Sequence, residues 1–159
     1  IAVDRGSKST REPGSSWLAS YELENCWRDQ TTAYSEERKA DIVVIYLGTN
    51  DILANKTDNL TNSMKELITK VKSYNPDAKI VWISGGMRTE CRPNIVEAIN
   101  SFGGESAGYY ICDMPKEFAQ VDANNNYVNT GYHGHPGVEQ QKVMAHTLID
   151  FLNNKNLVN

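Results

Sequence analysis

One apolar run and the polar turn that ends it limit what this chain can fold into more than any other feature. Residues 42–47 are apolar without alternation, and Gly48-Thr49-Asn50-Asp51 follows at once. An unbroken apolar run predicts a parallel strand that is buried on both faces. Because open α/β sheets bind ligands at the carboxyl ends of their strands, the polar turn is a candidate site.

Asn50 in this turn has two interpretations. A side-chain amide at a strand end can donate a hydrogen bond to a developing oxyanion without adding a competing charge. Alternatively, Asn50 or Asp51 only caps the helix that follows. The turn taken alone favours neither.

Similar patterns recur along the chain. Two more short strands are predicted at residues 79–84 and 109–113. Three helices are predicted from apolar residues at helical spacing: Leu60, Met64, Leu67, Ile68 and Val71; then Ile95, Val96 and Ile99; and last Val138, Val143, Met144, Leu148, Phe151 and Leu152. The first should begin near Thr57 or Asp58 and end before Pro76, and the second should end at Gly103-Gly104. This alternation indicates an α/β fold, a three-layer α/β/α sandwich with a mostly parallel sheet.

The residues before Asp41 follow a less regular pattern. Ile1-Ala2-Val3 has the character of a strand end, and residues 4–14 that of a loop. Ser15 or Ser16 could cap a short helix with Trp17, Leu18, Tyr21 and Cys26. With 159 residues, of which 40% are hydrophobic, the chain can bury one core, so residues 1–159 are expected to form a single domain.

Charge and apolar runs exclude some partners. The net charge of -4 and the lack of any Lys/Arg cluster argue against nucleic acid. No apolar run approaches the length that spans a bilayer, which argues against a membrane partner. Because the chain starts with Ile1 and not Met, a processed or truncated amino terminus is expected, and the absence of a leader is uninformative.

Cysteines and sequons bear on metal binding and location. Cys26, Cys91 and Cys112 are spaced too widely for a local metal site, and no histidine sits at a matching interval, so zinc is not expected. The sequons Asn55-Lys56-Thr57 and Asn59-Leu60-Thr61 in a polar stretch favour a secreted protein. In a secreted protein two of the cysteines could pair and leave the third free or bonded to another polypeptide.

A second polar stretch precedes the last predicted helix and contains His133 and His135-Pro136. A histidine before proline at a loop-to-helix junction has a restricted backbone and a ring offered to solvent, which suits a general base. His133 is better explained as a surface residue. His-x-His could also bind a metal, but no third ligand is apparent. His146 falls inside the last helix, where a solvated face explains it.

Together the two stretches resemble the SGNH, or GDSL-type, hydrolases. Gly48-Thr49-Asn50-Asp51 resembles their third block, and His135-Pro136 resembles the fifth, which supplies the catalytic histidine. The resemblance extends to carbohydrate esterase family 2 over residues 41–51, residues 74–80, Gly86-Met87 and residues 131–145. Members of that family are secreted enzymes that remove O-acetyl groups from plant cell-wall sugars. The resemblance implies an SGNH-like fold with flavodoxin-like strand order, an acetylated carbohydrate as substrate and no cofactor.

The chain departs from this family at the nucleophile, because no Gly-Asp-Ser or Gly-Asn-Ser block is present. Val3-Asp4-Arg5-Gly6 instead resembles the second block, whose glycine N–H belongs to the oxyanion hole. This implies that the first strand and the serine lie upstream of Ile1, on a segment that could be a cleaved fragment of the same protein. Ser7 is the other candidate, but it leaves no sequence for the second strand before Asp41. Since the first strand of SGNH hydrolases lies between the second and third, its absence would leave the sheet open there.

Two further departures affect the histidine. Tyr132 stands where many SGNH hydrolases have an orienting aspartate, although family 2 esterases can work as Ser-His dyads. Gly134 replaces an aromatic residue, which puts the sugar preference in doubt. The resemblance therefore implies that His135 deprotonates the serine, while Asn50 and the Gly6 N–H stabilise the oxyanion. The alternatives are a non-catalytic carbohydrate-binding or interaction module of the same fold and, last, an SGNH lipase or thioesterase.

Overall fold

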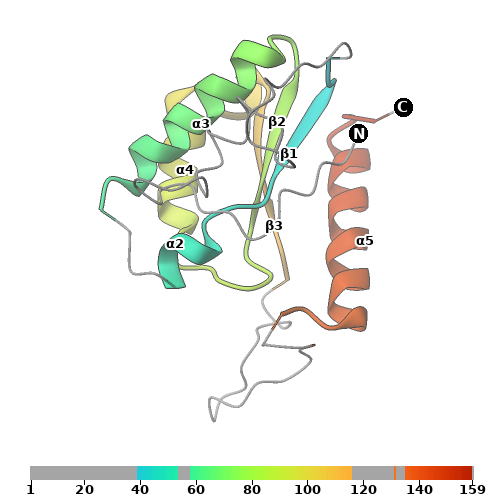
Figure 1. Ribbon diagram of the computed structural model, residues 1–159. Helices are drawn as coiled ribbons and strands as arrows, with labels where there is room; N and C mark the ends of the chain where they lie inside the picture. The colour runs from blue at the N-terminus through green and yellow to red at the C-terminus, as the bar shows by residue number, and fades with distance from the viewer. Residues whose placement is uncertain (1–38, 54–57, 116–130, 132–134, 159) are drawn as a thin grey trace, which may run out of the picture.

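The computed structural model describes residues 39–53, 58–115, 131 and 135–158 (Figure 1). The elements in these residues are β1 (Ile42–Ile45), α2 (Thr49–Leu53), α3 (Leu60–Tyr74), β2 (Lys79–Ser84), α4 (Arg92–Ser101), the 3-10 helix η1 (Gly104–Ala107), β3 (Tyr109–Asp113) and α5 (Val138–Asn154). The strand end, loop and helix expected before residue 39 lie outside the described residues.

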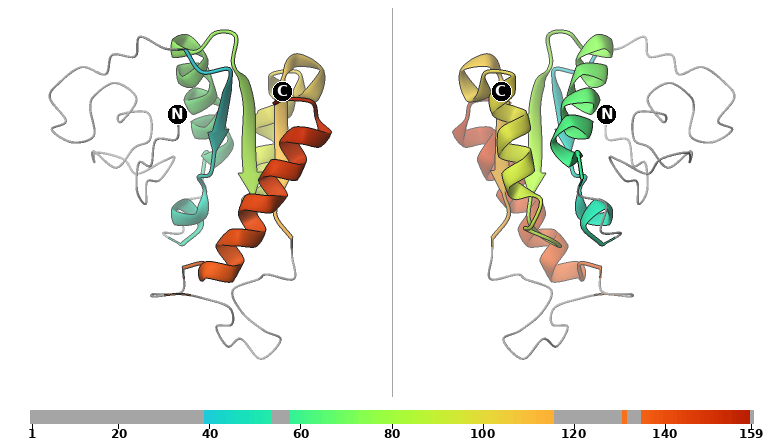
Figure 2. Two further views of the ribbon diagram at one scale, coloured as in Figure 1. Left: turned by 90° about the vertical axis from the view of Figure 1, so that its right-hand side faces the viewer. Right: turned by 90° about the vertical axis from the view of Figure 1, so that its left-hand side faces the viewer.

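The three strands form a parallel sheet in the order β1-β2-β3. Ile42 pairs with Lys79, and Ile80 pairs with Tyr109, so the carboxyl ends of all three strands meet at one edge. Helices α3 and α4 cover one face of the sheet and α5 covers the other (Figures 1 and 2). The predicted α/β class with a three-layer arrangement is confirmed.

Two cores lie on the two faces of the sheet. Alternate strand residues such as Ile80 and Trp82 pack with α3 and α4, and this core includes Met64, Ile68 and Ile95. Residues of the opposite parity pack toward α5: Val81, Ile83 and Cys112 are buried there, with Met144, Leu148 and Phe151 against them. β2 is buried on both faces, as the sequence predicts for an unbroken apolar run.

β1 corrects that expectation for residues 42–47. The strand ends at Ile45, and Val44 and Tyr46 are 40% and 36% exposed. The physical reason is position, because β1 is an edge of the described sheet, paired on one side by β2. β3 is likewise half-buried along most of its length, with Cys112 as its fully buried residue.

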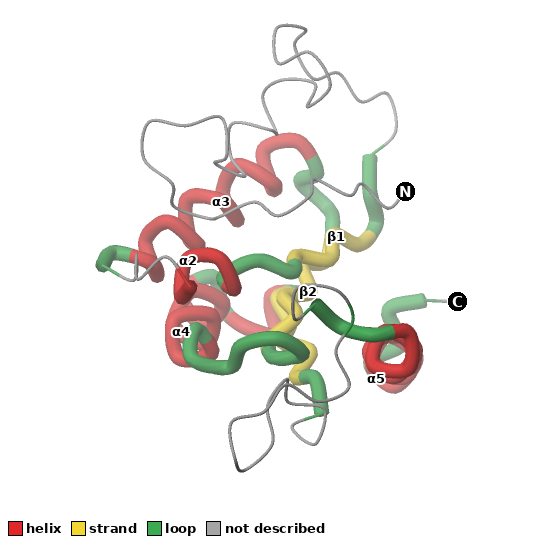
Figure 3. Tube along the Cα trace, turned by 60° about the horizontal axis from the view of Figure 1, so that its bottom comes forward, coloured by secondary structure: helices red, strands yellow, loops and turns green. Residues whose placement is uncertain are grey.

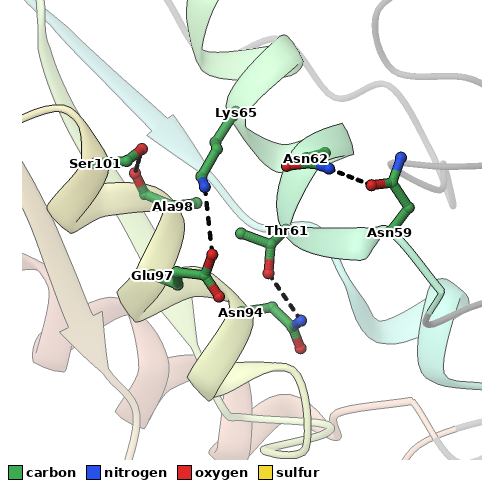
Figure 4. Close-up of polar contacts among 8 residues, drawn as sticks. All are labelled: Asn59, Thr61, Asn62, Lys65, Asn94, Glu97, Ala98 and Ser101. Atoms are coloured by element: carbon green, nitrogen blue, oxygen red, sulfur yellow. Dashed lines mark hydrogen bonds and ion pairs between the residues drawn. The ribbon is translucent and has the colours of Figure 1, made fainter.

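Polar contacts join α3 to α4 beside the apolar core (Figure 4). Asn94 Nδ2 donates to Thr61 Oγ1 at 3.0 Å, and Lys65 Nζ lies 3.3 Å from Glu97 Oε1. The exposed Lys65–Glu97 ion pair contributes little, so the shared core holds the two helices together. α3 begins at Leu60, slightly later than Thr57 or Asp58, after Asn59 in a left-handed conformation.

Candidate functional site

The turn after β1 forms the first part of the site. Gly48 has φ 120° and is buried, and its carbonyl accepts the hydrogen bond from Ile52 N–H that opens α2. A Cβ at this position would lie 2.9 Å from Cys91 Sγ, so both the backbone conformation and the space require glycine. The backbone that leads to Asn50 is therefore closely defined.

Asn50 and Asp51 lie inside the first turn of α2. Asn50 is half-buried, whereas Asp51 is fully buried. The cap position is the residue before the first helical residue, which is Gly48 and not Asn50. The geometry therefore does not support the interpretation that Asn50 only caps the helix.

The turn after β2, Gly85-Gly86-Met87, accepts hydrogen bonds from two residues whose importance the sequence did not reveal. Tyr46 Oη donates to the Gly85 carbonyl at 3.0 Å, and Gln140 Nε2 of α5 donates to the Gly86 carbonyl at 2.9 Å. Burial raises the pKa of the Tyr46 hydroxyl to about 12. The Met87 backbone lowers this pKa by a smaller amount, and the charge of Cys91 adds a small further rise. A hydroxyl within an apolar run was the available signal for Tyr46.

His135 lies three residues before α5 and is exposed. Its carbonyl accepts a hydrogen bond from Gly131 N–H at 2.6 Å, and Gln141 Nε2 donates to the Pro136 carbonyl at 2.9 Å. Figure 3 turns the carboxyl edge toward the viewer, with α2 on one side of the strands and the start of α5 on the other. From the roles that the family resemblance implies, we predict that the His135 ring faces Asn50 across this edge.

Other candidate residues divide into two groups. Gly6, Ser7, Cys26, Tyr132, His133 and Gly134 lie outside the described residues. His146 is exposed on α5, as a solvated face predicts. Cys91 and Cys112 are buried and free, so they do not pair with each other. Burial raises the pKa of both thiols, that of Cys112 to about 11.

A charged pair borders the site at β3. Arg92, at the start of α4, donates from Nε and Nη2 to the two carboxylate oxygens of Asp113, at 2.8 and 2.7 Å. These hydrogen bonds and the charge of Asp113 raise the pKa of Arg92. Across residues 39–53, 58–115, 131 and 135–158, no cluster of His, Cys, Asp and Glu could hold a metal ion. No helix in the same ranges has the length and apolar character to cross a membrane.

No protein-family model matches the sequence, and no curated protein matches it significantly. Solved structures do match. A family 2 carbohydrate esterase from Clostridium thermocellum, in complex with cellohexaose, has a TM-score of 0.75 and 21% identity over 96% of this chain and 49% of its own. An acetyl xylan esterase from Butyrivibrio proteoclasticus has a TM-score of 0.64 and 21% identity over 84% of this chain and 41% of its own.

A third structure is described as a carbohydrate esterase whose active site displays divergent catalytic and non-catalytic binding functions. Its TM-score is 0.60, at 17% identity over 77% of this chain and 41% of its own. The chain thus spans less than half the length of each of these three esterases. At these identities the likeness shows the fold alone, and the fold is that of family 2 carbohydrate esterases.

Proposed function

We propose that the protein is a secreted esterase that removes O-acetyl groups from carbohydrate. The observation that carries the proposal is Asn50, half-buried at the carboxyl edge of a sheet whose fold is shared with family 2 carbohydrate esterases. Asn50 follows the strongly constrained Gly48 without filling the cap position. A preorganised amide at a strand end is the kind of donor that stabilises an oxyanion.

In the proposed reaction a serine Oγ attacks the acetyl carbonyl carbon while His135 takes the serine proton. The amide of Asn50 and the Gly6 N–H stabilise the oxyanion, and the sugar hydroxyl leaves with the proton from His135. Water then attacks the acyl-enzyme, with His135 again as base, and acetate is released. We place the serine on a segment upstream of Ile1, because the chain lacks the nucleophile block of this fold.

The test measures hydrolysis of a small acetyl ester and of acetylated xylan by protein that includes the residues encoded upstream of Ile1. Asn50→Ala should lower kcat by about 10²-fold or more, as loss of one oxyanion donor does. His135→Ala should nearly abolish turnover, whereas His146→Ala, which removes an exposed histidine from α5, should not. Full activity in either of the first two variants contradicts the mechanism.

The alternative is a carbohydrate-binding module without turnover. It is favoured by the structural neighbour that holds cellohexaose and by the neighbour described as having non-catalytic binding functions. Calorimetric titration with cello-oligosaccharide separates the two functions. Binding without hydrolysis of any acetyl ester, unchanged in Asn50→Ala and His135→Ala, supports the module and contradicts the esterase.

A further inference from the structure

The turn Gly85-Gly86-Met87 after β2 is bonded by both segments that carry the proposed catalytic groups. From the β1 side, Tyr46 Oη donates to the Gly85 carbonyl at 3.0 Å. The hydroxyl of Tyr46 is therefore bonded to the first residue of this turn, although the residue as a whole is partly exposed.

From the α5 side, Gln140 is 1% exposed, and its Nε2 donates to the Gly86 carbonyl at 2.9 Å. The turn has no spare room, because a Cβ on Gly86 would lie 2.7 Å from Tyr46 Oη and 2.9 Å from Met144 Cε. Gly86 also has φ 78°, which favours glycine. The turn therefore fills the space between the end of β1 and the first turn of α5.

The turn is itself fixed to the sheet. The antiparallel bridge between Gly85 and Arg88 closes the turn, and Met114 N–H, just after β3, donates to the Ser84 carbonyl at 2.8 Å where the turn begins. The pairing of β2 with β3, which extends to Ser84 and Asp113, thus fixes the start of the turn. Because the turn is held in this way, it can keep the two segments that bond to it, at Tyr46 and Gln140, a fixed distance apart.

We propose that Tyr46 and Gln140 are positioning residues that set the separation between Asn50 and His135. Tyr46 precedes Asn50 by four residues and Gln140 follows His135 by five, each at the start or end of a regular element. This inference rests on the proposed esterase function. A displacement of about 1 Å between reacting groups can lower the rate by about 10²-fold, so the hydroxyl of Tyr46 matters for turnover without touching substrate.

The first experiment uses protein that includes the upstream residues. Tyr46→Phe and Gln140→Met should each lower kcat for a small acetyl ester by about 10-fold or more while KM changes by less than about twofold. Tyr110→Phe is the matched control, because Tyr110 lies on β3 on the same face of the sheet and should keep its kcat. Variants that are less stable but retain full kcat overturn the proposal.

The second readout does not need activity. In a double-mutant cycle, Tyr46→Phe and Gln140→Met act on one turn. The change in the unfolding equilibrium constant of the double variant should therefore differ from the product of the two single changes by about fivefold or more. Tyr110→Phe combined with Gln140→Met should be multiplicative. If both pairs of variants deviate from the product equally, the proposal that Tyr46 and Gln140 act through one turn is overturned. If the parent protein is inactive but still shows this coupling, the esterase function and the positioning of Asn50 and His135 are overturned. The structural coupling of Tyr46 and Gln140 through the turn is then supported.

Discussion

The indole N–H of Trp82 donates a hydrogen bond to the carbonyl oxygen of Leu47, 3.1 Å away. Trp82 is fully buried in β2, and Leu47 is the residue immediately before Gly48. The core between the sheet and helices α3 and α4 thus fixes the backbone at the entrance to the Asn50 turn. Stability and site geometry are coupled at this pair.

Trp82→Phe should destabilise the protein by about 2–4 kcal/mol, since it removes buried volume and leaves the Leu47 carbonyl without its donor. Chemical denaturation measures this loss. Ile80→Val, on the same strand and face, removes a methylene without a hydrogen bond and should cost about 0.5–1.5 kcal/mol. A Trp82→Phe loss no larger than that of Ile80→Val would show that the hydrogen bond contributes nothing.

The fold was largely predictable, because periodicity reports burial directly. The apolar stripe of α3 includes Met64, Ile68 and Val71, and all three are buried against the sheet. The apolar run in β2 likewise predicts a strand buried on both faces, as the structure shows. The exposed face of β1 could not be predicted, because the apolar run that contains Val44 is the same whether the strand is central or at an edge.

The site was less predictable, because hydrogen bonds to main-chain carbonyls leave no pattern in a sequence. Asn50 and His135 are candidates from the sequence and remain predictions, but Gln140 is one polar residue among several at the start of α5. Its contact with Gly86 joins residues 54 positions apart. Only the folded chain reveals such a pair.

Gly48→Ala should destabilise the protein by about 2–4 kcal/mol, from a strained φ of 120° together with the 2.9 Å approach to Cys91 Sγ. Thermal unfolding of Gly48→Ala, Cys91→Ala and the double variant separates the two causes. Removing the sulfur relieves the overlap but not the strain, so the double variant should lose less than the sum of the single losses. Gly48→Ala with Cys112→Ala, on the opposite face of the sheet, should be additive.

Arg92→Lys should change stability by no more than about 1 kcal/mol, because the Arg92–Asp113 pair is about half exposed. The two hydrogen bonds of the guanidinium are still specific, so any loss should shrink as salt rises from low to high concentration. Denaturation at several ionic strengths measures it. A loss above 2 kcal/mol that is independent of salt would mean that the pair is effectively buried.

Cys112 predicts how stability depends on alkaline pH. Burial, and then the charge of Asp113, raises the pKa of the thiol from 9.0 to about 11, so the folded state keeps a proton that the unfolded state releases. The stabilisation is complete below pH 9 and is lost as pH rises through 11, with a slope on the order of 1 kcal/mol per pH unit between these values.

Cys112→Ala should be less stable at pH 8 yet show a flatter decline in the free energy of unfolding from pH 9 to 11, measured by denaturation at each pH. Ile83→Val, a loss of volume in the same core cluster, should keep the slope of the parent protein. Parallel declines for Cys112→Ala and the parent would show that another group governs alkaline unfolding.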